Sequence, residues 1–205
     1  MDAYSYIARD GVFANAQTGN ILLVGVHLSE GELALALRYF LPVVAFAAGI
    51  MLADLVHDRF YGIIHWRQLT VAFEAAILLG VSFIPGTANL QANILTSFAC
   101  GMQVQSFRKI HGQGIATTMC IGNLRSALQN VDEYILTHNK GFLENGLLYL
   151  GVILTFVLGA VIGNKCIDAL GLHAIAVAAG ILAVAFFVMF IDREKAERAG
   201  KKSEL

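Results

Sequence analysis

Two short polar segments stand out in this apolar chain, and both contain a Gly-Asn pair: residues 18–20 and residues 122–123. Glycine permits a break in a helix, and threonine and asparagine side chains donate and accept hydrogen bonds. A helix N-terminus at such a break favours an anion or a carboxylate group. We therefore predict a binding site for a small polar or anionic solute, lined by Gln17, Thr18, Gly19, Asn20, Gln103, Thr117, Thr118, Gly122 and Asn123. The alternative is that both segments only cap a helix and pack it against its neighbour.

Two carboxyl groups are candidates for proton coupling. Glu74 lies several residues into an apolar stretch, and a carboxylate at that depth in a membrane costs a few kcal/mol. It therefore needs a partner, a cavity or a proton, and the alternative to proton transfer is a structural hydrogen bond with a neighbouring helix. Asp2 joins the site if it lies in a span, and is only solvated otherwise.

The same sequence disfavours several other kinds of site. His57 and His65 match no metal-binding spacing, so no metal site is predicted. The chain has no GxSxG, HExxH, P-loop or dinucleotide-binding motif, and we therefore expect neither an enzyme nor a cofactor. The net charge of −1 supplies no basic surface for nucleic acid.

The elements that must position these residues are apolar helices. The chain has 205 residues, 57% of them hydrophobic and 14% charged, with a mean hydropathy of +0.67. A soluble domain carries about 25% charged residues, and a membrane span takes about 20 apolar ones. We predict an all-α membrane protein with about six transmembrane helices, in a single integral membrane domain at 1–192 with a polar tail at 193–205. The apolar runs are about 33–56, 69–84, 92–104, 147–163 and 170–191.

The two halves of the chain also repeat each other. Residues 18–20 match 121–123, and Phe46-x-x-Gly49 matches Phe156-x-x-Gly159, in the same order and at a nearly constant spacing. Repeat one covers about 1–85 and repeat two about 91–192. If neither Gly-Asn segment crosses, most Lys and Arg residues lie on the side of the C-terminus, which is then cytoplasmic. Three crossings per repeat predict an inverted three-plus-three repeat, with two short broken or re-entrant Gly-Asn segments.

The repeat also bears on the N-terminal end. Apolar residues 94–100 precede Met102, whereas nothing precedes its counterpart Met1. We expect the first span to be truncated at the N-terminus of the chain as given.

The motifs together resemble the signature of the YoaK-like family of bacterial inner-membrane proteins, which is built around a domain of unknown function. The resemblance covers nearly the whole chain, and the residues that carry it are 1–6, 11–20, Phe46, Gly49, Glu74, Ala75, Ala99, 101–103, Thr117, Thr118, Gly122 and Asn123. It implies about six spans in the bacterial cytoplasmic (inner) membrane and a transporter or permease role. It implies no particular substrate.

We therefore expect a secondary transporter whose site forms at the interface of the two repeats, with the lipid bilayer and a small solute as partners. A passive small-solute channel is the first alternative, because broken helices also build pores. A non-transporting membrane subunit that packs with a partner is the second. Small residues at Gly49-x-x-x-Ala53 and Gly159-x-x-x-Gly163 are compatible with packing inside the chain or with a homo-oligomer.

Overall fold

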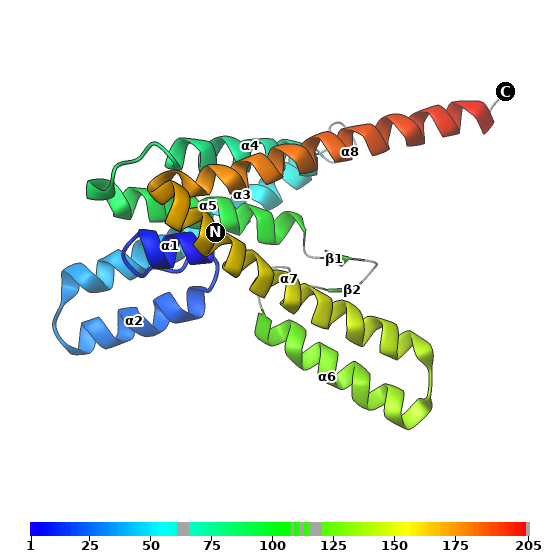
Figure 1. The fold of residues 1–205 in the computed structure, drawn as a ribbon, viewed down its shortest axis with the longest axis horizontal. Helices are drawn as coiled ribbons and strands as arrows, with labels where there is room; N and C mark the ends of the chain where they lie inside the picture. The colour runs from blue at the N-terminus through cyan, green and yellow to red at the C-terminus, as the bar shows by residue number, and fades with distance from the viewer. Residues whose placement is uncertain (61–65, 108, 111–112, 115–119, 204–205) are drawn as a thin grey trace.

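The computed structural model describes residues 1–60, 66–107, 109–110, 113–114 and 120–203, and its fold is drawn in Figure 1. Helices make up almost all of this part of the chain. A short antiparallel pair, β1 (Lys109–Ile110) and β2 (Gln113–Gly114), lies between the fifth and sixth helices. The α-helices of the described residues are α1 (Asp2–Ala8), α2 (Gln17–Ser29), α3 (Leu33–Phe60), α4 (Trp66–Val81), α5 (Asn89–Ser106), α6 (Cys120–Thr137), α7 (Lys140–Leu170) and α8 (Ile175–Ser203).

Polar residues and glycines mark the ends of the long helices. Asn139 caps α7, since its side-chain oxygen accepts a hydrogen bond from the Gly141 N–H at 3.0 Å. Gly171, with φ of 55°, follows the end of α7 and begins the 3₁₀ turn η2 (Gly171–Ala174) that leads into α8. Gly31, with φ of 77°, lies in the tight connection between α2 and α3. The breaks at Gly31 and Asn139 fold α2 on α3 and α6 on α7 as hairpins, whereas the turn at Gly171 redirects the chain from α7 into α8.

The centre of the molecule is a close crossing of α3 and α5. A Cβ atom added to Gly49 would lie 2.1 Å from the Phe98 carbonyl oxygen, and one added to Gly101 would lie 2.1 Å from the Phe46 carbonyl oxygen. No side chain fits at either position, so the two glycines set the distance between the helices. The small residues predicted to pack helices closely do so here, because Gly49 and Ala53 are both buried.

The other helices pack around this crossing and against one another. α4 packs on α5 and on α8, and α2 forms a hairpin with α3. α6 forms a second hairpin with α7, which projects from one side of the molecule (Figure 1). α1 packs on α7 and contributes Tyr4 to the main apolar core, where it meets Leu78, Ala99 and Ile175.

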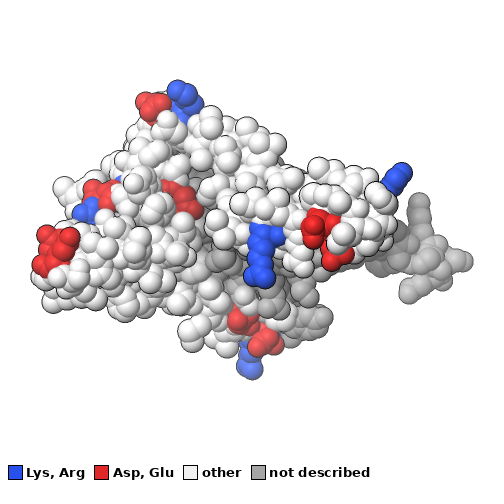
Figure 2. Space-filling model, turned by 90° about the horizontal axis from the view of Figure 1, so that it is seen from below, with Lys and Arg blue, Asp and Glu red and all other residues white. Residues whose placement is uncertain are grey.

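The surface and the helices agree with the predicted all-α membrane protein. Two segments of the described chain are long and apolar enough to cross a membrane by length and composition, namely Leu33–Arg59 and Lys140–Ile191. On the face drawn in Figure 2, charged side chains lie in small separate groups and most of the surface is uncharged. α4 has 16 residues and α2 has 13, below the usual length of about 20 for a span. The count of six spans and the inverted repeat stay predictions.

Most of the polar tail predicted at 193–205 lies in the helix α8. α8 continues through Asp192 and ends at Ser203. The helix therefore carries the chain from the apolar bundle into the charged C-terminal sequence without a break, and in Figure 1 its C-terminal part extends away from the other helices.

Candidate functional site

One large cavity collects residues from both halves of the chain. Its volume is about 910 Å³, and it lies between α1, α7 and α8 at the first turns of α2 and α6. Its lining is mostly apolar. Four residues of the predicted site line it. Gln17 and Thr18 lie at the start of α2, Gly122 at the start of α6, and Asp2 on α1. The structure therefore brings the two Gly-Asn segments to the same cavity.

The polar floor of this cavity contains acceptor atoms that are not used inside the protein. The Asp2 Oδ1 atom accepts a hydrogen bond from the Asn15 N–H at 2.7 Å and a longer one from the Ala16 N–H at 3.5 Å. Within the described residues, the Asp2 Oδ2 and Asn15 Oδ1 atoms have no hydrogen-bond partner. The Asn15 side chain is only 4% exposed and lines the cavity. A buried acceptor without a partner is costly, and a bound donor group would satisfy it.

The two asparagines of the Gly-Asn pairs do not line the cavity. Asn20 is fully buried and braces the loop before α2: its side chain accepts from the Phe13 N–H at 3.0 Å and donates to the Phe13 carbonyl at 2.7 Å. It also donates to the Gln17 side chain at 2.8 Å. Gly19 lies against the Phe13 ring, and Asn123 is buried on α6. For Asn20 the structure therefore supports the packing alternative.

The remaining predicted residues have different positions. Gln103 is half-buried on α5 and is not part of the cavity lining. Thr117 and Thr118 lie outside the described residues. Their predicted role at the site therefore stays a prediction.

Glu74 is the most isolated acid in the described part of the chain. Its side chain is 0% exposed on α4, and among the described residues neither of its carboxyl oxygens has a hydrogen-bond partner. It does not line the cavity. The two predicted proton-coupling residues therefore differ in position, since Asp2 lines the cavity and Glu74 does not.

Arg9 was not among the predicted functional residues, yet it is the largest fully buried side chain described. A guanidinium has five N–H donors, and the structure gives Arg9 five hydrogen bonds. They go to the Tyr4 hydroxyl at 2.8 Å, the Asn89 side chain at 2.9 Å, and the carbonyls of Pro85, Val81 and Ile84 at 3.1, 3.3 and 2.7 Å. The Val81 carbonyl belongs to the last residue of α4 and the other two follow it, so Arg9 lies at the helix end where the dipole favours a cation. With all its donors used, Arg9 holds α1 to the α4–α5 connection and has none left for a solute.

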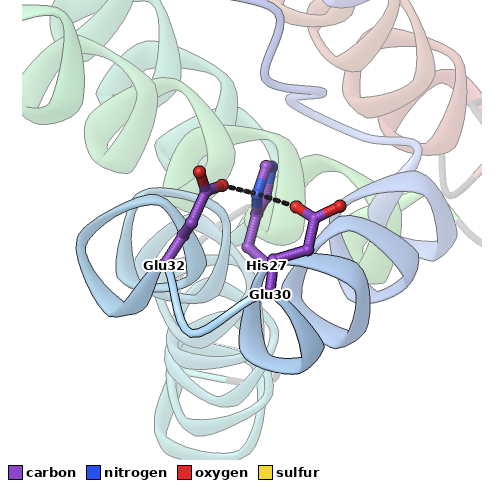
Figure 3. Close-up of side chains that lie close together, drawn as sticks. All are labelled: His27, Glu30 and Glu32. Atoms are coloured by element: carbon purple, nitrogen blue, oxygen red, sulfur yellow. Dashed lines mark hydrogen bonds and ion pairs between the residues drawn. The ribbon is translucent and has the colours of Figure 1, made fainter.

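A second feature missed from sequence is a His-Glu-Glu cluster at the α2–α3 turn (Figure 3). His27 Nδ1 lies 2.7 Å from a Glu32 carboxyl oxygen and 3.4 Å from one of Glu30. The three potential ligand atoms lie within 4.8 Å of one another, which is compatible with a divalent cation, but both glutamates are solvent-exposed. The spacing His-x-x-Glu-x-Glu across a helix end was the available signal. His27 Nδ1 already contacts the carboxyl groups of both Glu30 and Glu32.

The fold and the cavity define an all-helical protein of membrane type, and the comparisons with known proteins agree. The chain belongs to the DUF1275 family, described as proteins of unknown function, whose model matches residues 1–188. It is also similar to the UPF0700 transmembrane protein YoaK of Bacillus subtilis (strain 168), with 25% identity over 173 residues, covering 79% of this chain and 76% of that protein. No solved structure matches the chain. The predicted resemblance to a YoaK-like family is confirmed.

Proposed function

We propose that this protein is a secondary transporter that binds a small solute in the cavity at the first turns of α2 and α6. The observation that carries the proposal is the polar floor of that cavity. There the buried Asn15 Oδ1 and the Asp2 Oδ2 have no partner within the described residues. A purely structural cavity has no need of unpaired acceptors, whereas a site for a hydrogen-bond donor does.

The lining also limits the chemistry of the solute. No Lys, Arg or His side chain lines the cavity among the described residues, and Arg9 is fully used elsewhere. Asp2 adds a carboxyl group, and the walls are mostly apolar. We infer a neutral or cationic solute with an amine or hydroxyl group on an apolar body, in preference to the anion that the helix N-termini alone suggest. The Asp2 carboxyl group already accepts the Asn15 and Ala16 N–H groups directly before α2.

The pairing of helices supports an inverted repeat as the frame for transport. The matched segments fall at equivalent places, because 18–20 begins α2 and 121–123 begins α6, while Phe46 and Phe156 lie in the middle of α3 and α7. α2 pairs with α3 as α6 pairs with α7, and α4 packs on its counterpart α8. Rocking of one half against the other would then open the cavity to each side in turn. Glu74 is fully buried and its carboxyl oxygens have no hydrogen-bond partner among the described residues, so it is the residue that we propose to couple this motion to a proton.

The proposal is tested by ligand-dependent thermal stabilisation of the detergent-purified protein, because a ligand that binds the native state raises its melting temperature. The panel comprises hydrophobic amines, amino acids, sugars and small anions. We expect hits among the amines or amino acids, and we expect Asn15→Ala to abolish them. Asn130→Ala is the matched control, since Asn130 bonds to the Ser126 carbonyl on α6 and does not line the cavity. Hits confined to anions, or hits that survive Asn15→Ala, would contradict the proposed site.

The packing-subunit alternative is favoured by one observation, the fully local hydrogen bonding of Asn20. In that reading the first Gly-Asn segment only fixes the loop before α2. No ligand in the panel would then stabilise the protein, and Asn20→Ala would lower its stability alone. The unpaired acceptors of Asn15 and Asp2 would remain without an explanation.

A further inference from the structure

A strip of polar side chains runs along α6, in the hairpin that projects from one side of the molecule (Figure 1). Arg125, Gln129 and Glu133 follow one another at intervals of four residues, so they lie along one side of the helix. We name these three residues the α6 strip. Arg125 and Gln129 are exposed and Glu133 is half-buried. Among the described residues, none of the three side chains makes a hydrogen bond or an ion pair.

A second side of α6 packs on α7. Ala127 is buried against Tyr149, and a Cβ added to Gly146 would meet the Val131 Cγ2 atom at 3.4 Å. The middle of α6 therefore lies beside 146–149, which belongs to a segment long and apolar enough to cross a membrane. Among the described helices, α6 packs mainly on α7.

This position makes an unpaired charge on the α6 strip costly. A charged side chain at membrane depth needs a partner of opposite charge. The nearest acids on α6 after Arg125 are Asp132 and Glu133, about 10–12 Å further along the helix axis. No ion pair joins either of them to Arg125 in the described chain. The partner of Arg125 therefore has to come from outside this helix.

The α6 strip is complementary to itself. Gln129 lies at its centre, with the cation four residues before it and the acid four residues after it, about 6 Å to either side. When two α6 helices cross antiparallel on a twofold axis at Gln129, Arg125 of each copy faces Glu133 of the other. The two Gln129 amides then face each other, and each can donate and accept a hydrogen bond.

We propose that the α6 strip is the contact between two copies of this chain, which form a twofold dimer held by two Arg125–Glu133 ion pairs. A groove of about 430 Å³ beside the strip gives the second helix room. Gln129 and Glu133 line this groove, together with Ser126, Asn130, Phe142 and Tyr149. The inference rests on the strip and its groove, and it holds whether or not the protein transports a solute.

The third side of α6 has a different character. Leu124, Leu128 and Ile135 are exposed there, away from both α7 and the α6 strip. Their apolar side chains suit the lipid bilayer, whereas the opposite charges and the amide of the strip suit a polar protein surface. The helix therefore divides into a side for α7, a side for lipid and a side for the second copy.

The first test reverses the charges of the α6 strip and measures the mass of the protein in detergent by light scattering. We expect the unmodified chain at twice the 22.1 kDa of one chain. Arg125→Glu and Glu133→Arg should each halve this mass, because like charges then face each other, and the variant with both substitutions should recover the dimer. Arg125→Lys keeps the charge and should stay dimeric, as should the control Lys165→Glu, at an exposed position on α7.

Two outcomes of this test would overturn the proposal. One is an unmodified chain that has the mass of a single copy. The other is a double variant that melts at the temperature of the unmodified chain and yet stays a single copy. Crosslinking gives a second measurement that does not depend on the folding of the charge variants.

A cysteine on the twofold axis tests the contact in the bilayer. In a chain whose three cysteines are replaced by alanine, oxidised in vesicles, Gln129→Cys should form a disulfide between two copies, since a residue on the axis faces itself. Leu124→Cys, on the lipid side of the same helix, is the matched control and should remain a thiol. A Gln129→Cys chain that stays uncrosslinked, or a crosslink at Leu124→Cys in its place, would show that the α6 strip is not the contact.

Discussion

At the scale of single residues, buried polar groups divide into satisfied and unsatisfied ones. The side-chain N–H groups of Arg9 and Asn20 all donate to acceptors within the protein, so these two residues stabilise the fold. Asn15, Asp2 and Glu74 keep acceptor atoms without a partner among the described residues. Because an unsatisfied buried acceptor costs about 1–3 kcal/mol, the second group is where binding or proton transfer is expected.

The hydrogen bonds of Arg9 predict a stability effect. Lysine has three donors in place of five and lacks the planar fork, so Arg9→Lys should leave carbonyls at the end of α4 unpaired. We expect a loss of about 3 kcal/mol or more in the free energy of unfolding, measured by denaturant titration in detergent. Arg125→Lys, at an exposed position on α6, is the control and should change little. An equal effect of both substitutions would show that the buried contacts of Arg9 do not stabilise the fold.

The burial of Glu74 predicts an effect on coupling. Glutamine keeps the shape of the side chain but has no titratable proton, so Glu74→Gln should abolish uptake driven by a pH gradient while exchange of solute between the two sides continues. The measurement is solute flux in proteoliposomes with and without an imposed gradient. Unchanged gradient-driven uptake would assign the proton to another group, or would favour the passive channel.

At the scale of helices, the closest contact is the α3–α5 crossing. Gly49→Ala and Gly101→Ala each place a methyl group against a backbone carbonyl oxygen, and each should lower the free energy of unfolding by about 2–3 kcal/mol. Gly80→Ala on α4, where a Cβ meets nothing within 4 Å, should be neutral or slightly stabilising because alanine favours a helix. The measurement is the melting temperature of each of the three variants in the same detergent. Equal melting temperatures would mean that the crossing is looser than the structure shows.

The helical elements and their polar ends were predictable from local patterns. Apolar runs gave the all-α class, and the paired Gly-Asn segments indicated residues at the cavity, of which Gln17, Thr18 and Gly122 line it. The direction of each side chain was not predictable. Asn20 bonds back to its own loop, and Arg9 reaches the Pro85 carbonyl 76 residues away. Contacts of that kind depend on which helices become neighbours, which periodicity in one sequence does not determine.

At the scale of the whole molecule, the starts of α2 and α6 lie at one cavity. The first half is tightly packed around α5, whereas the second half leaves the groove between α7 and α8 open in the described chain. This unequal filling accounts for the size of the cavity and for its mostly apolar walls. In the proposed function, the polar floor near Asp2 and Asn15 is the part of the cavity that selects the solute.

The most direct test of the account is solute flux in proteoliposomes with Gly122→Phe, using a compound that stabilises the purified protein. Gly122 lines the cavity and a Cβ there meets nothing within 4 Å, so the ring should obstruct the cavity at the first turn of α6 without disturbing the fold. The control is Gly25→Phe, at an equally open position on α2 away from the cavity. The account predicts that Gly122→Phe abolishes flux at an unchanged melting temperature while Gly25→Phe transports normally. Normal flux through Gly122→Phe would contradict the claim that this cavity is the transport site.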